Sequence, residues 1–121
     1  MKVIIAGGRD FNDYLLLLQA VVKANFDITE VVSGGAKGAD ALGELFARDM
    51  DLPLALFPAD WDKHGRAAGP IRNGEMAGYA DALIAMWDGK SSGTRNMINQ
   101  AKDRGLKVHV ERYEQTNPKN F

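Results

Sequence analysis

Short apolar segments alternate with segments of helical periodicity along this chain of 121 residues. Five segments have the composition of strands, namely residues 3–6, 31–33, 54–57, 83–87 and 106–110. Four segments repeat apolar residues at helical spacing, namely residues 15–22, 38–49, a helix with Pro70 at its first position, and 94–104. Strands alternating with helices imply parallel strands joined by right-handed crossovers. The sequence therefore predicts an α/β fold around a five-stranded parallel sheet.

Several short signals mark the ends of these helices. Asn12 or Asp13 is placed to cap the first helix, and Ser92 or Thr94 to cap the last. Gly105 is expected to end that last helix. The segment from residue 58 to 69 has no helical periodicity, so we expect a long loop there.

Composition restricts the class of protein. Hydrophobic residues make up 45% and charged residues 26%, which is close to globular averages. The longest apolar run, residues 82–87, is too short to cross a bilayer, so we expect no membrane partner. The absence of cysteine excludes disulfides, thiolate nucleophiles and cysteine-based zinc sites, and no histidine cluster suggests a metal. A strand begins directly after Met1, so we expect no signal peptide and a cytoplasmic location.

Length and charge add two further expectations. The chain is long enough for one domain with its own core, which we place at residues 1–112, followed by a C-terminal tail at 113–121. The formal net charge of −1 argues against wholesale electrostatic binding of nucleic acid. It leaves room for a local basic patch.

Glycine and basic residues gather in the loops that follow the predicted strands. Nine of the 13 glycines lie there: Gly7, Gly8, Gly34, Gly35, Gly38, Gly65, Gly69, Gly89 and Gly93. Seven of the 15 lysines and arginines lie there too: Arg9, Lys37, Lys63, Arg66, Arg72, Lys90 and Arg95. Ligands of parallel sheets bind beyond the carboxyl ends of the strands. This asymmetry indicates a site for an anionic ligand at that edge.

The segment from Val31 to Asp40 has the pattern of a strand, a glycine turn and a helix start. Such turns expose main-chain N–H groups that attract phosphate. The turn matches neither the Walker loop nor the full dinucleotide fingerprint, in which glycine would replace Ser33. One interpretation is a phosphate site, with Lys37 neutralising charge and Asp40 binding a ribose hydroxyl. The alternative is a tight turn that needs glycine only for packing.

Two other loops carry candidate ligand contacts. Arg9 follows two glycines and suits phosphate or carboxylate, although it can instead pair with Asp10 or Asp13 to order its loop. Trp61 can stack on a base or pack its loop onto the domain. His64 can serve acid–base chemistry or remain a polar loop residue.

The last two predicted helices also begin with polar residues. Arg72 and Asn73 can face the same crevice, although Arg72 can instead pair with Glu75 on the helix surface. The main-chain N–H groups near Gly93 and Thr94 form a second potential anion site.

Four ordered motifs give the chain a resemblance to a known family. They are GGRDFND, VVSGGAKGAD, FPADWDKHGRAAGPIRN and SSGTRN. With these motifs the chain resembles the SLOG superfamily, in its small YspA-like, cpYpsA-related branch, which is distantly related to lonely-guy phosphoribohydrolases and molybdenum-cofactor carrier proteins. The resemblance implies a single Rossmann-like, three-layer domain with strand order 3-2-1-4-5 and helices on both faces. It also implies a nucleotide or nucleotide-derived ligand, and a homo-oligomer.

One departure from the lonely-guy enzymes concerns catalysis. Gly93 and Thr94 match the end of their Pro-Gly-Gly-x-Gly-Thr loop, and Arg72 resembles their conserved arginine. The glutamate that those enzymes carry two residues after the threonine falls at Asn96. An amide cannot act as a base in place of a carboxylate.

We therefore expect a sensor or carrier of a nucleotide or NAD/ADP-ribose-like ligand, and we name no other cofactor. Two alternatives stay open: a hydrolase of the N-glycosidic or phosphate bond of a nucleotide, and a single-stranded DNA-binding protein. Catalytic candidates are Arg72, Glu75 and Asp88. The expected ligand-binding residues are Gly7, Gly8, Arg9, Gly34, Gly35, Lys37, Gly38, Asp40, Asp60, Trp61, Arg66, Arg72, Asn73, Ser92, Gly93 and Thr94.

Overall fold

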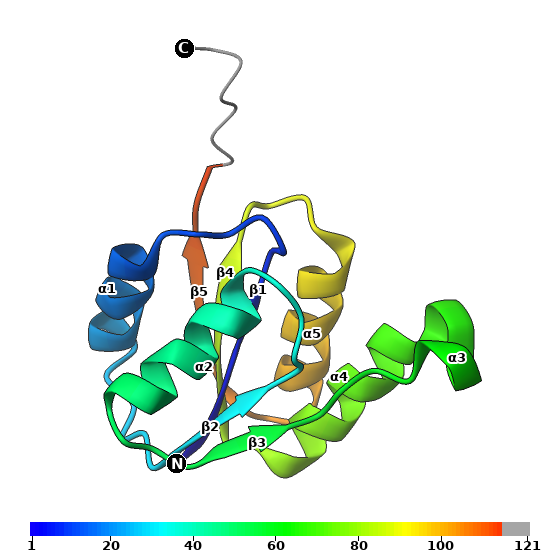
Figure 1. Cartoon of the computed structure of the whole chain (residues 1–121), viewed down its shortest axis with the longest axis horizontal. Coiled ribbons are helices and arrows are strands. Elements are labelled where there is room, and N and C mark those ends of the chain that lie inside the picture. The colour runs from blue at the N-terminus through cyan, green and yellow to red at the C-terminus, as the bar shows by residue number, and fades with distance from the viewer. Residues whose placement is uncertain (115–121) are drawn as a thin grey trace.

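A computed structural model describes residues 1–114 and contains one five-stranded sheet. The strands are β1 (Lys2–Gly7), β2 (Glu30–Ser33), β3 (Leu54–Leu56), β4 (Ala82–Trp87) and β5 (Lys107–Arg112). Their order is β3-β2-β1-β4-β5, and every pair is parallel (Figure 1). The predicted α/β class and the strand order 3-2-1-4-5 are confirmed.

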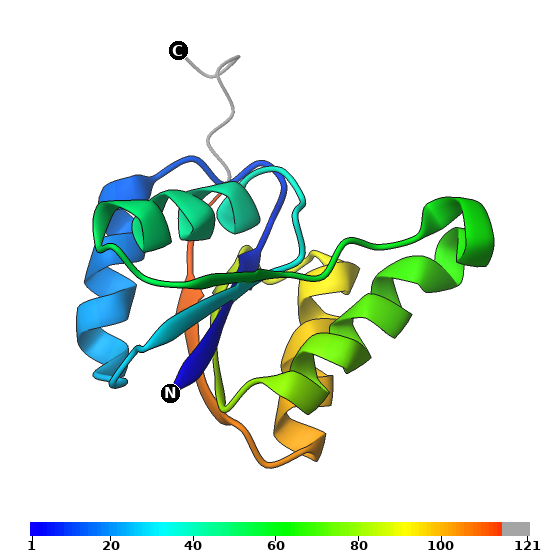
Figure 2. The ribbon, with the colours of Figure 1, turned by 60° about the horizontal axis from the view of Figure 1, so that its bottom comes forward.

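Helices cover both faces of the sheet, as predicted (Figure 2). On one face lie α1 (Tyr14–Ala24) and α2 (Ala39–Asp49). On the other face lie α4 (Ala68–Tyr79) and α5 (Ser92–Asp103). The Rossmann-like, three-layer arrangement is therefore confirmed.

Alternate residues of the central strands enter two separate cores. In β1, Val3 and Ile5 pack with α1 and α2, whereas Ile4 and Ala6 pack with α4 and α5. All four side chains are buried. This double burial explains why residues 3–6 of β1 are all apolar rather than alternating with polar residues.

The predicted loop at residues 58–69 is wrong for most of its length. A four-residue helix, α3 (Trp61–His64), is followed by a 3₁₀ turn (Gly65–Ala67) that leads into α4. The Asp60 side chain caps α3 by accepting a hydrogen bond from the Lys63 N–H at 3.1 Å. A helix of one turn is too short to show a periodic pattern. In Figure 2, α3 and the start of α4 project from the body of the domain.

Some of the predicted helix caps are confirmed and others are wrong. Asp13 caps α1, and Gly105 follows α5 with a positive φ of 77°, both as predicted. Ser91 caps α5 through the Thr94 N–H, so the predicted Ser92 or Thr94 cap is wrong. Pro70 is the third residue of α4 and not the first. A first-turn residue needs no main-chain N–H, which is why proline fits there.

The end of the described chain packs against the domain. The Tyr113 N–H donates to the Trp87 carbonyl at 3.1 Å, and the Tyr113 ring meets the Phe11 ring with centroids 4.9 Å apart. The rest of the predicted tail, residues 115–121, lies outside the described residues. Every helix in residues 1–114 is too short or too polar to span a membrane.

Candidate functional site

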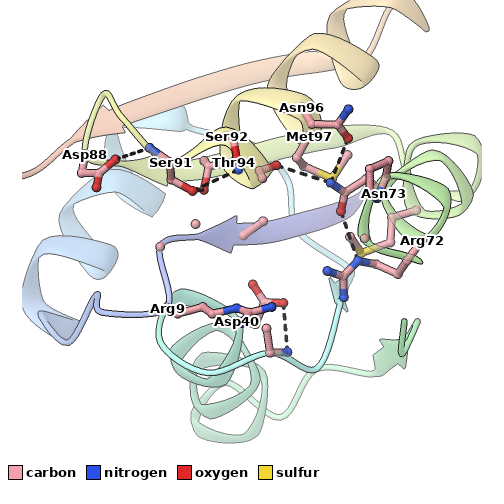
Figure 3. Close-up of a pocket in the computed structure, with 18 of the residues that line it drawn as sticks. Arg9, Asp40, Arg72, Asn73, Asp88, Ser91, Ser92, Thr94, Asn96 and Met97 are labelled. Atoms are coloured by element: carbon pink, nitrogen blue, oxygen red, sulfur yellow. Dashed lines mark hydrogen bonds between the residues drawn. The ribbon is translucent and has the colours of Figure 1, made fainter. Parts of the chain in front are cut away.

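A cavity of about 740 Å³ opens where β1 and β4 end, between the two helical layers (Figure 3). This volume lies in the usual range for small-molecule sites. The cavity is lined by Ala6, Gly7, Gly8, Arg9, Asp10, Ala36, Asp40, Trp61, Arg66, Gly69, Pro70, Arg72, Asn73, Met76, Asp88, Ser91, Ser92, Gly93, Thr94, Asn96 and Met97. It therefore lies at the edge of the sheet that the glycine and arginine distribution indicates.

Most of the expected ligand-binding residues meet at this cavity. Those on its wall are Gly7, Gly8, Arg9, Asp40, Trp61, Arg66, Arg72, Asn73, Ser92, Gly93 and Thr94. Those away from its wall are Gly34, Gly35, Lys37, Gly38 and Asp60. Of the catalytic candidates, Arg72 and Asp88 line the cavity and Glu75 does not.

The glycine turn after β2 uses its own side chains to satisfy its main-chain N–H groups. The Gly35 N–H donates to Ser33 Oγ at 3.1 Å, and the Ala36 N–H donates to Asp40 Oδ2 at 3.2 Å. At the start of α2, the Ala39 N–H donates to the Gly8 carbonyl at 3.1 Å. These groups already have partners, so the turn does not present them to a ligand.

Asp40 and Arg72 form the charged inner part of the wall. Asp40 is buried, and burial raises the pKa of its carboxyl, whereas the Ala36 N–H and the Arg72 guanidinium lower it. Arg72 Nη1 donates to the Gly34 carbonyl at 2.6 Å, and burial lowers the pKa of this guanidinium. Arg72 therefore joins α4 to the β2–α2 turn, and the predicted surface pair with Glu75 does not form.

Neutral amides join α4 to α5 along the next part of the wall. Asn73 Nδ2 donates to Asn96 Oδ1 at 3.1 Å, and Asn73 Oδ1 accepts from Arg72 Nε at 3.1 Å (Figure 3). Gln100 Nε2 donates to Asn96 Oδ1 and to the Pro70 carbonyl, both at 2.9 Å. Asn96 thus serves as a hydrogen-bond acceptor within the wall.

The start of α5 presents main-chain N–H groups to the cavity. The Asp88 carboxylate accepts from the Ser91 and Lys90 N–H groups at 2.8 Å, and these bonds lower its pKa. Within residues 1–114, the Ser92 and Gly93 N–H groups have no hydrogen-bond partner. No atom lies within 4 Å of a Cβ built on Gly93, so this helix end is open.

Arg9 and Trp61 approach each other across the mouth of the cavity. The Arg9 guanidinium carbon lies 5.9 Å from the centre of the Trp61 ring. Beside them, Asp10 accepts a hydrogen bond from the Tyr113 hydroxyl at 2.8 Å. Arg9 forms no ion pair with Asp10 or Asp13. His64 does not line the cavity. Residues 1–114 contain no group of acidic and histidine side chains arranged to hold a metal ion.

Several wall residues were not expected from the sequence. Ala6, Met76 and Met97 are buried core residues whose edges reach the cavity, and no sequence signal separates them from the rest of the core. Ser91 carries a usable signal, because serine followed by a helix start is a typical cap. Ser91 lies in the loop that follows β4, and it lines the cavity.

Comparison with known proteins assigns the chain to a family. The model of the YspA, cpYpsA-related SLOG family matches residues 1–64. The chain belongs to this family. The Gene 61 protein of Mycobacterium phage D29 is 35% identical over 117 residues, covering 88% of this chain and 93% of that protein. The resemblance stated from the four motifs is confirmed for this SLOG protein.

A solved structure supports the fold. The X-ray structure of DNA processing protein A (DprA) from Streptococcus pneumoniae superposes with a TM-score of 0.73 at 17% sequence identity. The match covers 90% of this chain and 49% of that chain, so this SLOG protein spans about half the length of DprA. At this identity the likeness shows a shared fold.

Proposed function

We propose that the cavity binds a phosphate-bearing, nucleotide-derived ligand and that the protein acts as a sensor or carrier of it. One observation carries this proposal: three arginines and the open N–H groups of the α5 start face a single cavity. The arginines are Arg9, Arg66 and Arg72. Guanidinium groups and helix starts both favour phosphate.

The carboxylates on the same wall accept hydrogen bonds from neutral groups of the protein. Asp10 accepts from Tyr113, Asp40 from Ala36, and Asp88 from its own loop, so each is held by the protein. Within residues 1–114, Arg9 and Arg66 have no carboxylate partner. Their charge is therefore available to an anion.

Calorimetric titration with ADP-ribose, NAD and AMP tests the proposal. Arg66→Ala should weaken the best of these ligands about tenfold to hundredfold, because a hydrogen bond to a charged group contributes about 1.5–3 kcal/mol. Lys102→Ala is the control, since Lys102 is an exposed basic residue in the last turn of α5 and lies off the cavity wall. Equal affinity of the two variants, or no binding of any ligand, would contradict the proposal.

A second candidate function, hydrolysis of an N-glycosidic or phosphate bond, is favoured by Asp40. A buried carboxyl with a raised pKa beside a cavity is a typical acid–base group. Against it, Asn96 replaces the expected glutamate, and Asp88 is held by the loop amides. Incubation with nucleoside monophosphates and NAD, followed by chromatography, decides this point. Product that Asp40→Asn and Arg72→Ala no longer release would establish an enzyme.

DNA is a third ligand to test, because the fold is shared with a protein named for DNA processing. A labelled single-stranded oligonucleotide should be retained with a steep dependence on salt if the arginines contact several phosphates. Retention that disappears in Arg66→Ala would favour DNA. No retention at low salt would remove this candidate.

The resemblance also predicts a homo-oligomer. Light scattering of the same samples measures the oligomeric state.

A further inference from the structure

Trp61 stands at the mouth of the cavity with little around it. It is the first residue of α3 and is 49% exposed, although most large aromatic rings in proteins are covered. One edge of the indole rests on Gly69, where a built Cβ would lie 3.4 Å from it. Arg9, which comes from the β1–α1 loop, approaches the same ring and lines the same cavity.

From this arrangement we infer that Arg9 and Trp61 form a clamp that holds the planar base of the ligand. The inference rests on the proposed function and names the part of the ligand that the mouth recognises. Both side chains are planar, and both stack on nucleobases. The clamp would therefore select a nucleotide over a sugar phosphate.

The spacing of the pair supports this inference. Stacked planar groups lie about 3.5–4 Å apart, so a ring between Arg9 and Trp61 requires roughly 7 Å. The Arg9 guanidinium carbon lies 5.9 Å from the centre of the Trp61 ring, which is farther than in a directly stacked pair and short of the distance that an intervening ring requires. A small outward movement of one side is enough to admit a base.

The two sides of the clamp differ in how they are held. The main chain beside Arg9 is fixed, because the Gly8 N–H donates to the Met86 carbonyl and the Gly8 carbonyl accepts from Ala39. Trp61 belongs to α3, whose main packing partners are the 3₁₀ turn and α4. Gly65 follows α3 with a φ of 56° and open space around it. The Trp61 side is therefore the side that can move.

Arg9 is free to take part in stacking. Its neighbour Asp10 is held by the Tyr113 hydroxyl, and no carboxylate within residues 1–114 pairs with Arg9. Deeper in the cavity, Arg72 and the start of α5 carry the features that suit phosphate. A ligand that spans both regions needs a base at one end and a phosphate farther along, as a nucleoside monophosphate has at its other end and ADP-ribose has in its middle.

The chain offers a direct optical test, since it contains two tryptophans and only Trp61 lines the cavity. Trp87→Phe leaves Trp61 as the single tryptophan. We would titrate this variant with AMP, UMP and ribose 5-phosphate while recording its fluorescence. AMP and UMP should quench Trp61, and AMP should bind about tenfold tighter than ribose 5-phosphate, because a stacked base contributes about a factor of ten or more.

Substitutions of Trp61 separate stacking from packing. By calorimetry in the otherwise natural chain, Trp61→Leu should reduce AMP affinity to that of ribose 5-phosphate, while Trp61→Phe retains a preference for AMP. The melting temperatures of both variants show whether each still folds. Ribose 5-phosphate binding as tightly as AMP would overturn the clamp and leave the proposed function standing. No binding of AMP or UMP would overturn the clamp, and the proposed function would fail with it if ADP-ribose and NAD also do not bind.

Discussion

Asp40 shows how one residue can serve a turn and a cavity together. Its carboxylate accepts the Ala36 N–H and faces the cavity, while burial opposes its ionisation. The group therefore binds its proton more tightly in the folded chain than in the unfolded chain. Its contribution to the free energy of unfolding falls as pH rises from the ordinary aspartate pKa through the raised pKa, and stays low above it.

Asp40→Asn should increase the free energy of unfolding at neutral pH. The asparagine oxygen can still accept the Ala36 N–H, and the cost of a buried charge is removed. The gain should vanish below the ordinary aspartate pKa, where the carboxyl is protonated in both states. Urea denaturation at the two pH values measures the effect, with exposed Asp62→Asn as the matched control. A less stable Asp40→Asn at neutral pH would show that Arg72 outweighs burial.

At the scale of elements, Gly38 allows the β1–α1 loop to lie directly against the start of α2. It has a φ of 74°, and a built Cβ would overlap main-chain atoms of Gly8 and Arg9. Gly35, in the same turn, has a φ of 75° and open space. The two glycines thus share a conformation but differ in their surroundings.

Alanine at these two positions should have unequal effects. Gly35→Ala should cost about 1–2 kcal/mol for the left-handed conformation. Gly38→Ala should cost a further 1–3 kcal/mol or so, because the two segments must separate to admit the methyl group. Chemical denaturation of both variants gives the difference. Similar losses would show that the contact contributes little.

The side-chain amides between α4 and α5 form a second contact between elements. Asn73 is buried and joins Asn96, the Gly93 carbonyl and Arg72. Asn73→Ala should destabilise the protein by about 1–3 kcal/mol, because buried polar partners lose their hydrogen bonds. Asn99→Ala, at an exposed site of α5, should stay within about 0.5 kcal/mol of the parent protein. Equal stability of the two variants would contradict a structural role for the network.

For the molecule as a whole, a ligand that binds only the folded chain must stabilise it. At a free concentration of 100 times Kd, the gain is about 2.7 kcal/mol. For a domain of this size that corresponds to a rise in melting temperature of roughly 10 °C. A melting series over ADP-ribose concentration should show this rise and its loss in Arg66→Ala. A melting temperature independent of concentration would argue against binding.

Much of the fold can be predicted from the chain because burial leaves a clear pattern. The apolar runs of β1 and β4 mark central strands, and the alternation of strands and helices dictates parallel pairing. The site edge is also visible, since Arg9, Arg72 and Gly93 follow different strands and meet at one end of the sheet.

The hydrogen bonds inside the site are harder to predict from the sequence. A main-chain N–H group can bond to a side chain of its own loop or to a ligand, and the sequence has no pattern that separates the two cases. Spacing suggested that the turn after β2 offers its N–H groups to a ligand, but the N–H groups of Gly35 and Ala36 donate to Ser33 and Asp40. Helix α3 was missed although Asp60 carries a capping signal, since one turn shows no periodicity. Whether a side chain satisfies its own loop or an outside group depends on three-dimensional distances.

The main-chain role of Gly8 has a consequence for how this site can change. Its N–H and carbonyl connect the end of β1 to β4 and α2 without using any side chain. Substitution at the neighbouring position 9 therefore leaves that framework in place. If Arg9 contacts the ligand as proposed, substitution at this position should change ligand preference, by selection or by protein engineering, while the scaffold beneath keeps its shape.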